Sequence, residues 1–334
     1  MKAVRLHELG GPRSLRVEDV PARAPGPGEI SVRIRRAALN RRDIFITQGL
    51  YPGIQLPATL GSDGAGTVAA LGEGVSDPAI GSEVVIDPQL GWSDLTYQAS
   101  RTSSILGTPV DGTFAEYVVV PAINVYPRPA GLNDDEAAAI PLGGLTAYRA
   151  VFTRGHITKD DVVLITGVGG GVQTFALLFA VHAGARVVVT SSSDEKLERA
   201  KALGAQAGIN SRTSAEWFKE VRAATDGGPS LVIEASGGEV LARCLDIARP
   251  GARVVIYGGT AGDAKIRPFS IFWKQLSVLG TSMGSPSDFA AMLGLFAGGL
   301  HPVIDRVFPL ERCVDAAERM LAAEQFGKIV LAVA

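Results

Sequence analysis

The sequence predicts an α/β protein with two domains, one rich in β-strands and one built on a doubly wound parallel sheet. The chain has 334 residues, which exceeds the size of one ordinary hydrophobic core. Residues 1–120 consist of short alternating or β-branched runs between Gly- and Pro-rich turns, as in a barrel or sandwich. From residue 161, apolar runs alternate with helical stretches, which indicates a parallel sheet covered on both faces.

The composition argues against several classes of protein. The chain has 34 acidic and 32 basic residues, a net charge of −2 and no Lys- or Arg-rich run, so we expect neither nucleic acid nor a membrane as a partner. No apolar run reaches the length of a membrane span or of a signal-peptide core, so we expect a soluble, cytoplasmic protein. Cys244 and Cys313 lie far apart in predicted helices, which favours neither a disulfide nor a clustered metal site.

The predicted strands set the domain boundaries. In the first part they are MKAVRLH, SLRVEDV, EISVRIRRAAL, GAGTVAAL, SEVVID and FAEYVVV. In the second part they are VVLIT, RVVVT, AGIN, LVIE, RVVIY and SVLGT. The tail, with VIDRVF, a helix and KIVLAV, is predicted to return to the first domain. We therefore expect a β-rich domain of residues 1–122 and 298–334 and a dinucleotide-binding domain of residues 123–297.

A glycine loop follows the first strand of the predicted parallel sheet. The residues Gly167, Gly169, Gly170 and Gly171 lie between VVLIT and a helix that begins near Val172. Glycines at this turn let backbone N–H groups approach a pyrophosphate at the helix N-terminus. The strict G-x-G-x-x-G pattern is absent, because Val172 or Gln173 holds the place of the last glycine. The alternative is a turn needed only for packing of the helix on the sheet, but the five further strands favour a dinucleotide site.

The end of the second strand indicates which dinucleotide is preferred. An acidic residue there would hold the ribose of NAD and repel a 2′-phosphate. This chain has Ser191, Ser192 and Ser193, followed by Lys196, which favours NADP. Asp194 weakens this prediction, and a capped helix with a solvated Lys196 is the alternative.

Several stretches together resemble the medium-chain dehydrogenase/reductase superfamily. They are LNRRDIFITQGLYP, LPATLGSDGAGTV, DGTFAEYVVVP, AAAIPLGGLTAYRA, VLITGVGGGV and GKIVL. The resemblance implies a GroES-like catalytic domain and a Rossmann domain. Within the superfamily the chain looks most like the zinc-free quinone-oxidoreductase branch, whose members reduce quinones or enones with NADPH.

The resemblance also indicates that no zinc is bound. Zinc-dependent relatives hold their catalytic metal with Cys, His and Cys, and often have a Glu beside the His. The matching positions here are Asn40, Ser62, Asp63 and Leu142, which do not form a zinc ligand set. Residues 88–109 match the structural-zinc lobe in position and contain no cysteine, so we expect packing around Trp92 and Tyr97 or a mobile lobe.

The resemblance implies the residues of the site. Asn40, Asp43 and Tyr51 match residues that line the substrate pocket, and the Tyr51 hydroxyl could donate to an oxygen that gains charge. The alternatives are an aromatic packed in a turn for Tyr51, and a helix N-cap with its N3 partner for Asn40 and Asp43. The implied cofactor contacts outside the glycine and serine loops are Thr146, Tyr257, Gly258, Gly259, Ser282, Met283, Gly284 and Lys328.

Together these observations predict a zinc-independent oxidoreductase that transfers hydride from NADPH to a quinone or to an activated enone or carbonyl. The alternatives are a small-alcohol dehydrogenase and an NADPH-binding protein with little turnover that acts as a redox-responsive partner. The expected partner is a small-molecule substrate. Relatives associate through the dinucleotide domain, so we also expect a homodimer, with SVLGTSM as an edge segment that could pair with its copy.

Overall fold

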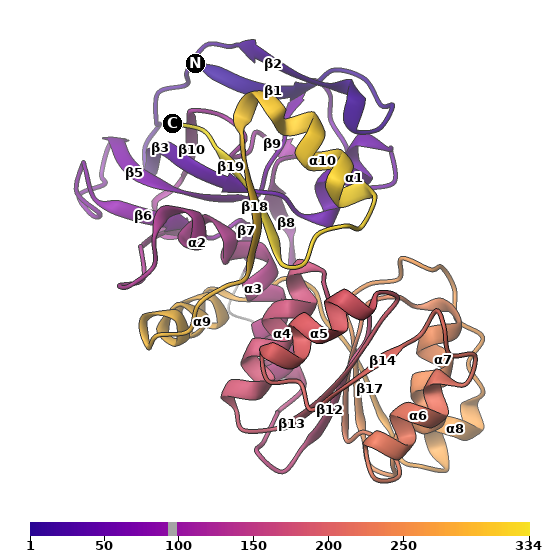
Figure 1. Cartoon of the computed structure of the whole chain (residues 1–334). Helices are drawn as coiled ribbons and strands as arrows, with labels where there is room; N and C mark the ends of the chain where they lie inside the picture. Colours follow the sequence, from indigo (N-terminus) through magenta and orange to yellow (C-terminus); the bar gives the residue numbers. More distant parts are fainter. Residues whose placement is uncertain (93–98) are drawn as a thin grey trace. The chain divides into compact units, whose positions relative to one another are not determined.

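The computed structural model describes residues 1–92 and 99–334 and forms two compact units (Figure 1). The first unit comprises Met1–Leu145 and Ser285–Ala334, and the second comprises Thr146–Gly284. Among the described residues, no helix is long and apolar enough to cross a membrane.

The first unit is built around a seven-stranded sheet in which β11, β6, β5, β3, β19 and β18 follow one another and β10 also pairs with β3. Alternating apolar residues of these strands supply the core, including Ile30, Val32 and Ile34. The strands are β3 (Glu29–Ala38), β5 (Asp63–Leu71), β6 (Glu83–Ile86), β10 (Tyr117–Pro121), β11 (Val125–Pro127), β18 (Ile304–Pro309) and β19 (Lys328–Ala332).

Two three-stranded sheets and several helices complete this unit. The small sheets are β2 (Leu15–Asp19), β1 (Lys2–Leu6) and β4 (Ala58–Thr59), and β7 (Gln89–Trp92), β8 (Ala99–Leu106) and β9 (Pro109–Val110). The α-helices are α1 (Arg41–Thr47), α2 (Asp134–Ala139), most of α3 (Pro141–Tyr148), α9 (Pro286–Ala297) and α10 (Cys313–Leu321). Short 3₁₀ turns are η1 (Pro12–Ser14), η2 (Ala122–Asn124) and η4 (Leu310–Arg312).

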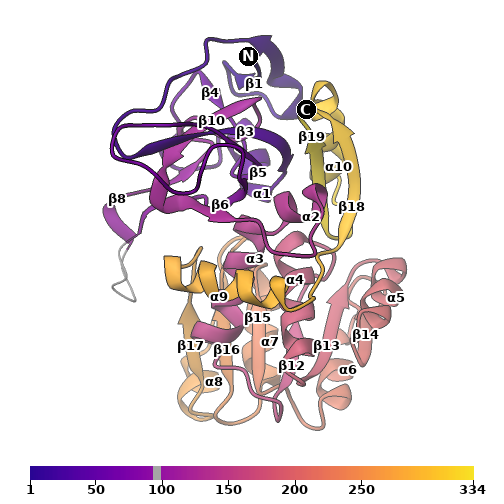
Figure 2. The same ribbon diagram turned by 90° about the vertical axis from the view of Figure 1, so that its left-hand side faces the viewer.

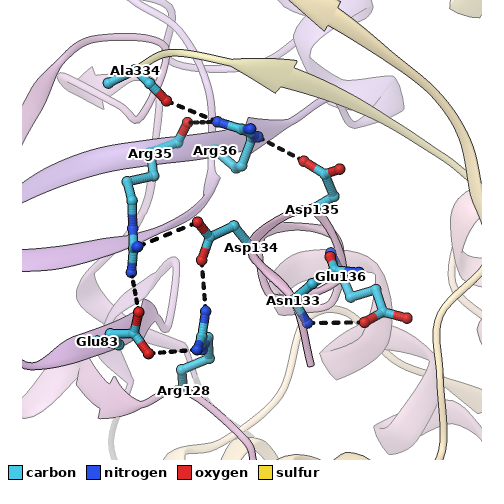
Figure 3. Close-up of polar contacts among 9 residues, drawn as sticks. All are labelled: Arg35, Arg36, Glu83, Arg128, Asn133, Asp134, Asp135, Glu136 and Ala334. Carbon is cyan, nitrogen blue, oxygen red and sulfur yellow. Dashed lines mark hydrogen bonds and ion pairs between the residues drawn. The ribbon is translucent and has the colours of Figure 1, made fainter. Parts of the chain in front are cut away.

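A ring of four charged side chains ties α2 to the sheet (Figure 3). Glu83 lies 2.6 Å from Arg35 and 2.5 Å from Arg128, and Asp134 lies 2.6 Å from Arg128 and 3.4 Å from Arg35. Each cation therefore has two anionic partners, and each anion has two cationic partners. Such a closed network holds the start of α2 more firmly than one exposed ion pair would.

The division of the chain differs from the boundaries expected at residues 122 and 297. Residues 123–145 and 285–297 belong to the first unit, because β11 pairs with β6 and because the Tyr126 and Phe289 rings pack with centroids 4.9 Å apart. In the sequence these segments resemble the helices of the second unit, but their tertiary contacts are with the first.

The second unit is a six-stranded sheet in the order β14, β13, β12, β15, β16, β17, and every neighbouring pair is parallel. This is the doubly wound order in which the chain returns to the sheet centre after the third strand. The strands are β12 (Val162–Ile165), β13 (Arg186–Ser191), β14 (Ala207–Asn210), β15 (Leu231–Glu234), β16 (Arg253–Ile256) and β17 (Ser277–Gly280).

Helices cover both faces of this sheet, with α4 and α5 on one face and α6, α7 and α8 on the other (Figures 1 and 2). They are α4 (Gly171–His182), α5 (Asp194–Ala202), α6 (Trp217–Ala224), α7 (Gly238–Ile247) and α8 (Pro268–Phe272), and a π-helical segment, η3 (Arg149–Arg154), precedes β12. The predicted fold class, a β-rich domain with a doubly wound parallel sheet, is confirmed.

Candidate functional site

The loop between β12 and α4 contains the glycines predicted to bind a dinucleotide. Gly167 has a φ of 67° and Gly169 a φ of 124°, a region that favours glycine. A Cβ atom added at Gly167 would meet nothing within 4 Å, so the backbone there faces open space. The loop leads into α4 at Gly171 and Val172, where the first N–H groups of the helix lack intrahelical acceptors. Such a loop and helix end suit a pyrophosphate.

Two side chains lie over this loop. The Cδ and Nζ atoms of Lys196 are 2.8 Å and 3.3 Å from the position that a Cβ of Gly169 would take. The amide oxygen of Gln173 occupies the corresponding position at Gly170. A larger residue at either glycine would have to displace the end of one of these side chains. Lys196 therefore brings its ammonium group to the glycine loop as well as to the start of α5.

The three serines after β13 have different surroundings. The Ser191 hydroxyl donates to the carbonyl oxygen of Val168 at 3.3 Å, which ties the glycine loop to β13. The Ser193 hydroxyl accepts from the N–H of Lys196 at 3.4 Å and caps α5. Ser192 is exposed. Two of the three hydroxyls expected to seat a 2′-phosphate therefore have partners within the protein, and Ser192 faces solvent.

Two hydroxyls that follow β16 and β17 are buried without a hydrogen-bond partner among the described residues. They belong to Tyr257 and Thr281. Burial raises the pKa of the Tyr257 hydroxyl and the charge of Glu234 raises it further, so this group stays a neutral donor. The neighbouring Gly258 and Gly259 are exposed. A buried hydroxyl without a partner at a strand end is a suitable contact for a bound ligand.

The turn after β17 brings Thr146 and Met283 together. Met283 has a φ of 47°, which non-glycine residues seldom adopt, and its sulfur lies 4.0 Å from the Thr146 hydroxyl. Thr146, Met283 and Gly284 are buried, and Ser282 is exposed. A strained residue held in place by its surroundings is typical of a ligand-binding turn. Together with the glycine loop and the two partnerless hydroxyls, this turn shows that the second unit fits a nicotinamide dinucleotide.

The first unit contains a buried cluster centred on Asp63. The Nζ of Lys328 donates to the Leu39 carbonyl at 2.8 Å, to Oδ1 of Asn40 at 2.7 Å and to Oδ2 of Asp63 at 2.7 Å. The Nδ2 of Asn40 donates to Oδ2 of Asp63 at 2.9 Å, and the N–H of Leu142 donates to Oδ1 at 2.7 Å. Asp63 is 0% and Lys328 2% exposed. We call Asn40, Asp63, Leu142 and Lys328 the Asp63 cluster.

Lys328 is predicted to contact the cofactor, and in this structure its ammonium group lies in the Asp63 cluster. An ammonium group has three N–H donors, and all three of those of Lys328 are engaged by buried oxygens. A cofactor contact would therefore require Lys328 to give up one of these acceptors. The other predicted cofactor residues all lie in the second unit, whereas Lys328 lies in the first.

Arg42 organises the residues next to this cluster. Its Nη1 donates to the Ser62 hydroxyl at 2.7 Å and to the Leu106 carbonyl at 2.6 Å. Its guanidinium carbon lies 4.8 Å from the centroid of the Tyr51 ring, which also packs against the core. The Tyr51 ring therefore packs against the core of the first unit. Its hydroxyl is the part of the side chain that could contact a substrate.

Asn40 and Asp43 form the cap at the start of α1, which is one of the two roles that the sequence left open. Asn40 is the N-cap residue of α1, and its backbone N–H donates to Oδ2 of Asp43 at 2.7 Å. The other oxygen of Asp43 is buried without a partner among the described residues. Burial raises the pKa of the Asp43 carboxyl to about 6, although the charge of Arg42 and the N–H of Asn40 oppose the shift. Such a carboxyl changes protonation state close to neutral pH.

The lobe of residues 88–109 is only partly described. It contains β7, β8 and β9, which pair with one another, and Trp92 at the end of β7 is half-buried. Tyr97, the other residue expected to hold the lobe, lies outside the described residues.

Comparison with known proteins identifies the family. Residues 171–298 match the zinc-binding dehydrogenase family, and residues 26–130 match the GroES-like domain of alcohol dehydrogenases. A zinc-type alcohol dehydrogenase-like protein, YogA, of Leptosphaeria maculans is 36% identical over 96% of this chain and 94% of its own length. The chain belongs to the medium-chain dehydrogenase/reductase superfamily.

Two further members of the superfamily show its range. A quinone oxidoreductase of Rattus norvegicus is 28% identical over 99% of this chain and 97% of its own. The crystal structure of an NAD-dependent alcohol dehydrogenase matches with a TM-score of 0.92 and 38% identity over 100% of both chains. The predicted superfamily is confirmed, and the chain is an oxidoreductase of this superfamily.

The residues at the zinc positions of the superfamily do not fit zinc. Asn40, Ser62, Asp63 and Leu142 supply no thiolate and no imidazole. Their one carboxylate, on Asp63, already accepts from Asn40, Leu142 and Lys328, so a metal ion would have to displace a buried ammonium. Within residues 1–92 and 99–334, no group of three or more His, Cys, Asp and Glu side chains is placed to hold a metal ion.

The sequence did not predict the pairing of Asp63 with Lys328 or the contacts that Arg42 makes beside this pair. The available signal was Lys328 itself, a charged residue within the apolar strand GKIVL. A lysine in a buried strand requires an anionic partner, because an unpaired buried charge is too costly. The sequence does not show which of its 34 acidic residues serves as that partner.

The raised pKa of Asp43 predicts how stability changes with pH. The folded chain holds a proton on Asp43 up to about pH 6, whereas the carboxyl has an ordinary pKa of 3.8, so stability falls as pH rises between these values. Asp43→Asn removes this effect. The free energy of unfolding of this variant minus that of wild type should therefore be about 2–3 kcal/mol larger at pH 8 than at pH 4, which means that the variant gains stability relative to wild type as pH rises. Denaturant unfolding at both pH values measures this difference.

The matched control is Asp315→Asn, at an exposed carboxylate on α10. Its effect on stability relative to wild type should change between these pH values by at most about 1 kcal/mol, because its ion pair with Arg312 is exposed. An Asp43→Asn effect that changes as little with pH would show that the buried carboxyl titrates at its ordinary pKa.

Proposed function

We propose that this chain is a zinc-independent reductase that transfers hydride from NADPH to a quinone or to an activated enone or carbonyl. The observation that carries this proposal is the Asp63 cluster. Asp63, at one of the positions where zinc-dependent members of the superfamily hold their metal site, is paired with the Lys328 ammonium at 2.7 Å. Without a metal to bind an alkoxide, neutral hydrogen-bond donors are left to stabilise a developing negative charge.

The chain offers two such donors at the predicted substrate positions. The Nδ2 group of Asn40 has one N–H on Asp63 and a second that no described residue accepts. The Tyr51 hydroxyl belongs to a half-buried ring that is held by Arg42. NADPH, when bound, supplies the hydride. The protein's part is to orient the substrate with these donors, and Asp43, with a pKa of about 6, is placed to hold or release a proton near neutral pH.

The alternative function is dehydrogenation of a small alcohol. The names of two relatives favour it, since one is a zinc-type alcohol dehydrogenase-like protein and the other an NAD-dependent alcohol dehydrogenase. The side chains at positions 40, 62 and 142 oppose it, because alcohol oxidation in this superfamily relies on a metal-bound alkoxide that they cannot provide.

A paired assay tests the proposal against this alternative. Purified protein is given NADPH with a panel of quinones, enones and aldehydes, and NAD⁺ or NADP⁺ with a panel of small alcohols. We expect turnover in the first panel, unchanged by a chelator or by added zinc. Alcohol oxidation that requires zinc would overturn the proposal, and cofactor binding without turnover in either panel would indicate a binding protein.

Preference for NADPH is the second expected outcome. The chain has no acidic residue at the end of β13, Ser192 is exposed there, and the carboxylate of Asp194 is held 2.7 Å from the Asn210 amide. A charge-assisted contact from Lys196 to a phosphate contributes about 1.5–3 kcal/mol, so NADPH should bind at least about tenfold more tightly than NADH. Titration of both cofactors measures the ratio.

Two substitutions and one control refine this test. Lys196→Ala should reduce the ratio, and Ser192→Asp should reverse it, because a carboxylate repels a 2′-phosphate and holds a ribose hydroxyl. Lys201→Ala, on the same helix and paired with Glu198, should leave the ratio unchanged. Equal wild-type affinities for the two cofactors would contradict the NADPH preference.

We also propose that the chain forms a homodimer through β17. This strand lies at the end of the six-stranded sheet, and Val278 on it is 38% exposed. Just before it, Phe269, Phe272 and Trp273 are 57–71% exposed, which is unusual for large apolar side chains. Antiparallel pairing of β17 with its copy around a twofold axis would satisfy the strand edge and cover apolar surface.

Val278→Asp tests this assembly. It places like charges near each other across the proposed pairing, so the protein should change from dimer to monomer by sedimentation analysis while its circular dichroism stays the same. Ile123→Asp, at a 77% exposed apolar residue of the first unit, should not change the mass. A wild-type monomer would contradict the proposed dimer.

A further inference from the structure

We propose that Asp63 and Lys328 are positioning residues for the reaction, and that they act by holding the side-chain amide of Asn40 in one orientation. The inference rests on the proposed function, because it assumes that Asn40 contacts the substrate. It assigns to Lys328 a role different from the cofactor contact that its sequence motif implies.

The chemistry of the two partners determines how the Asn40 amide is turned. An ammonium group can only donate hydrogen bonds, and an ionised carboxylate can only accept them. The oxygen of Asn40 must therefore face Lys328, at 2.7 Å, and its nitrogen must face Asp63, at 2.9 Å. A rotated amide would place donor against donor and acceptor against acceptor. The second N–H of Asn40 is then always the group left for the substrate.

The burial of the pair makes this orientation rigid. Asp63 is 0%, Lys328 2% and Asn40 7% exposed, so water cannot replace the partners at low cost. The Lys328 ammonium has no N–H left over, because the Leu39 carbonyl accepts the third. Asp63 likewise uses its second oxygen to accept from the N–H of Leu142. Lys328 therefore has no donor left for a substrate, and Asp63 is fully buried and can only accept hydrogen bonds, so neither residue can donate to a substrate oxygen.

The register of the sheet brings these residues together. In the central sheet, Ala38 of β3 lies opposite Asp63 of β5 on one side and opposite Val330 of β19 on the other. Because β3 and β19 are antiparallel, two further residues along β3 lead to Asn40 and two residues back along β19 lead to Lys328. The pairing of β3 with β5 and β19 therefore places the backbones of Asn40, Asp63 and Lys328 close together.

The first test removes each partner in turn. Lys328→Met takes away the cation that faces the Asn40 oxygen. Asp63→Asn takes away the anion, and its NH₂ group must face donors, either the N–H of Leu142 or Lys328 and the Nδ2 of Asn40. Each variant weakens the hold on the Asn40 amide, so kcat for enone or quinone reduction should fall about tenfold to a hundredfold. The dissociation constant for NADPH should stay within about twofold of wild type, because the other predicted cofactor residues lie in the second unit.

The matched control separates positioning from stability. Asp305 is also a buried carboxylate of the first unit, with its side chain 2% exposed. It accepts from Arg319 at 2.7 Å and from the N–H of Phe326 at 3.0 Å, which are not members of the Asp63 cluster. Asp305→Asn should lower the melting temperature, as Asp63→Asn does, yet leave kcat unchanged. If both substitutions lower kcat to the same extent, the role of Asp63 is structural only and the proposal is overturned.

A double-mutant cycle shows whether the effect passes through Asn40. If it does, then Lys328→Met should cause no further loss of kcat in a protein that already carries Asn40→Ala. Fold losses that multiply would overturn the proposal. Asp63→Asn in the same background gives a second cycle with the same two outcomes, should Lys328→Met fail to fold. A wild-type protein without any reductase turnover would instead contradict the proposed function.

Discussion

The buried carboxylate of Asp63 is the constraint on which the first unit depends. A carboxylate at 0% exposure is tolerated only when its charge is compensated and its oxygens are hydrogen-bonded, and here Lys328, Asn40 and the N–H of Leu142 do this. These partners come from β19, from the start of α1 and from α3, so one anion joins segments far apart in the sequence. Removing either charge of the ion pair would leave the other buried and unpaired, so each of the two residues requires the other.

Much of the architecture could be predicted because local patterns agree with the global fold. The six runs from VVLIT to SVLGT are β-branched and apolar throughout, as buried parallel strands are, and all six form the second sheet. The boundaries of the units were less predictable. Residues 134–148 are Ala-rich helix and resemble the second unit by composition, but α2 is held to the first by the ion pairs around Asp134. Which surface a helix packs against depends on tertiary contacts that composition does not encode.

In the candidate site, too, the residue types could be predicted from the sequence more readily than their tertiary contacts. The glycine loop was predictable, because a positive φ at Gly167 and Gly169 is a local requirement of the backbone. The three serines were less so: their residue type suits a phosphate, yet Ser191 bonds to Val168 and Ser193 caps α5. Lys328 was linked to the cofactor through its motif, and only the register of β3 with β19 and β5 shows that it meets Asp63. A motif describes the residue types along one segment of the chain. The partner of a buried charge depends on which strands pair and in which register, and a motif does not contain this information.

The Asp63 cluster also explains why substrate activation must come from other groups. Like a metal ion, the Lys328 ammonium gathers oxygens from separate segments around one positive centre, at 2.7–2.8 Å. Unlike a metal ion with an open position, it has three donors and all are used, so it offers nothing to an incoming carbonyl. The buried Asp63 oxygens can only accept hydrogen bonds, so they cannot polarise a carbonyl either. The cation can stabilise the fold and orient Asn40, and in the proposed reaction the second N–H of Asn40 and the hydroxyl of Tyr51 would polarise the substrate. A neutral pair of donors suits acceptors such as quinones, whose reduced forms already delocalise negative charge, better than it suits an unactivated alcohol.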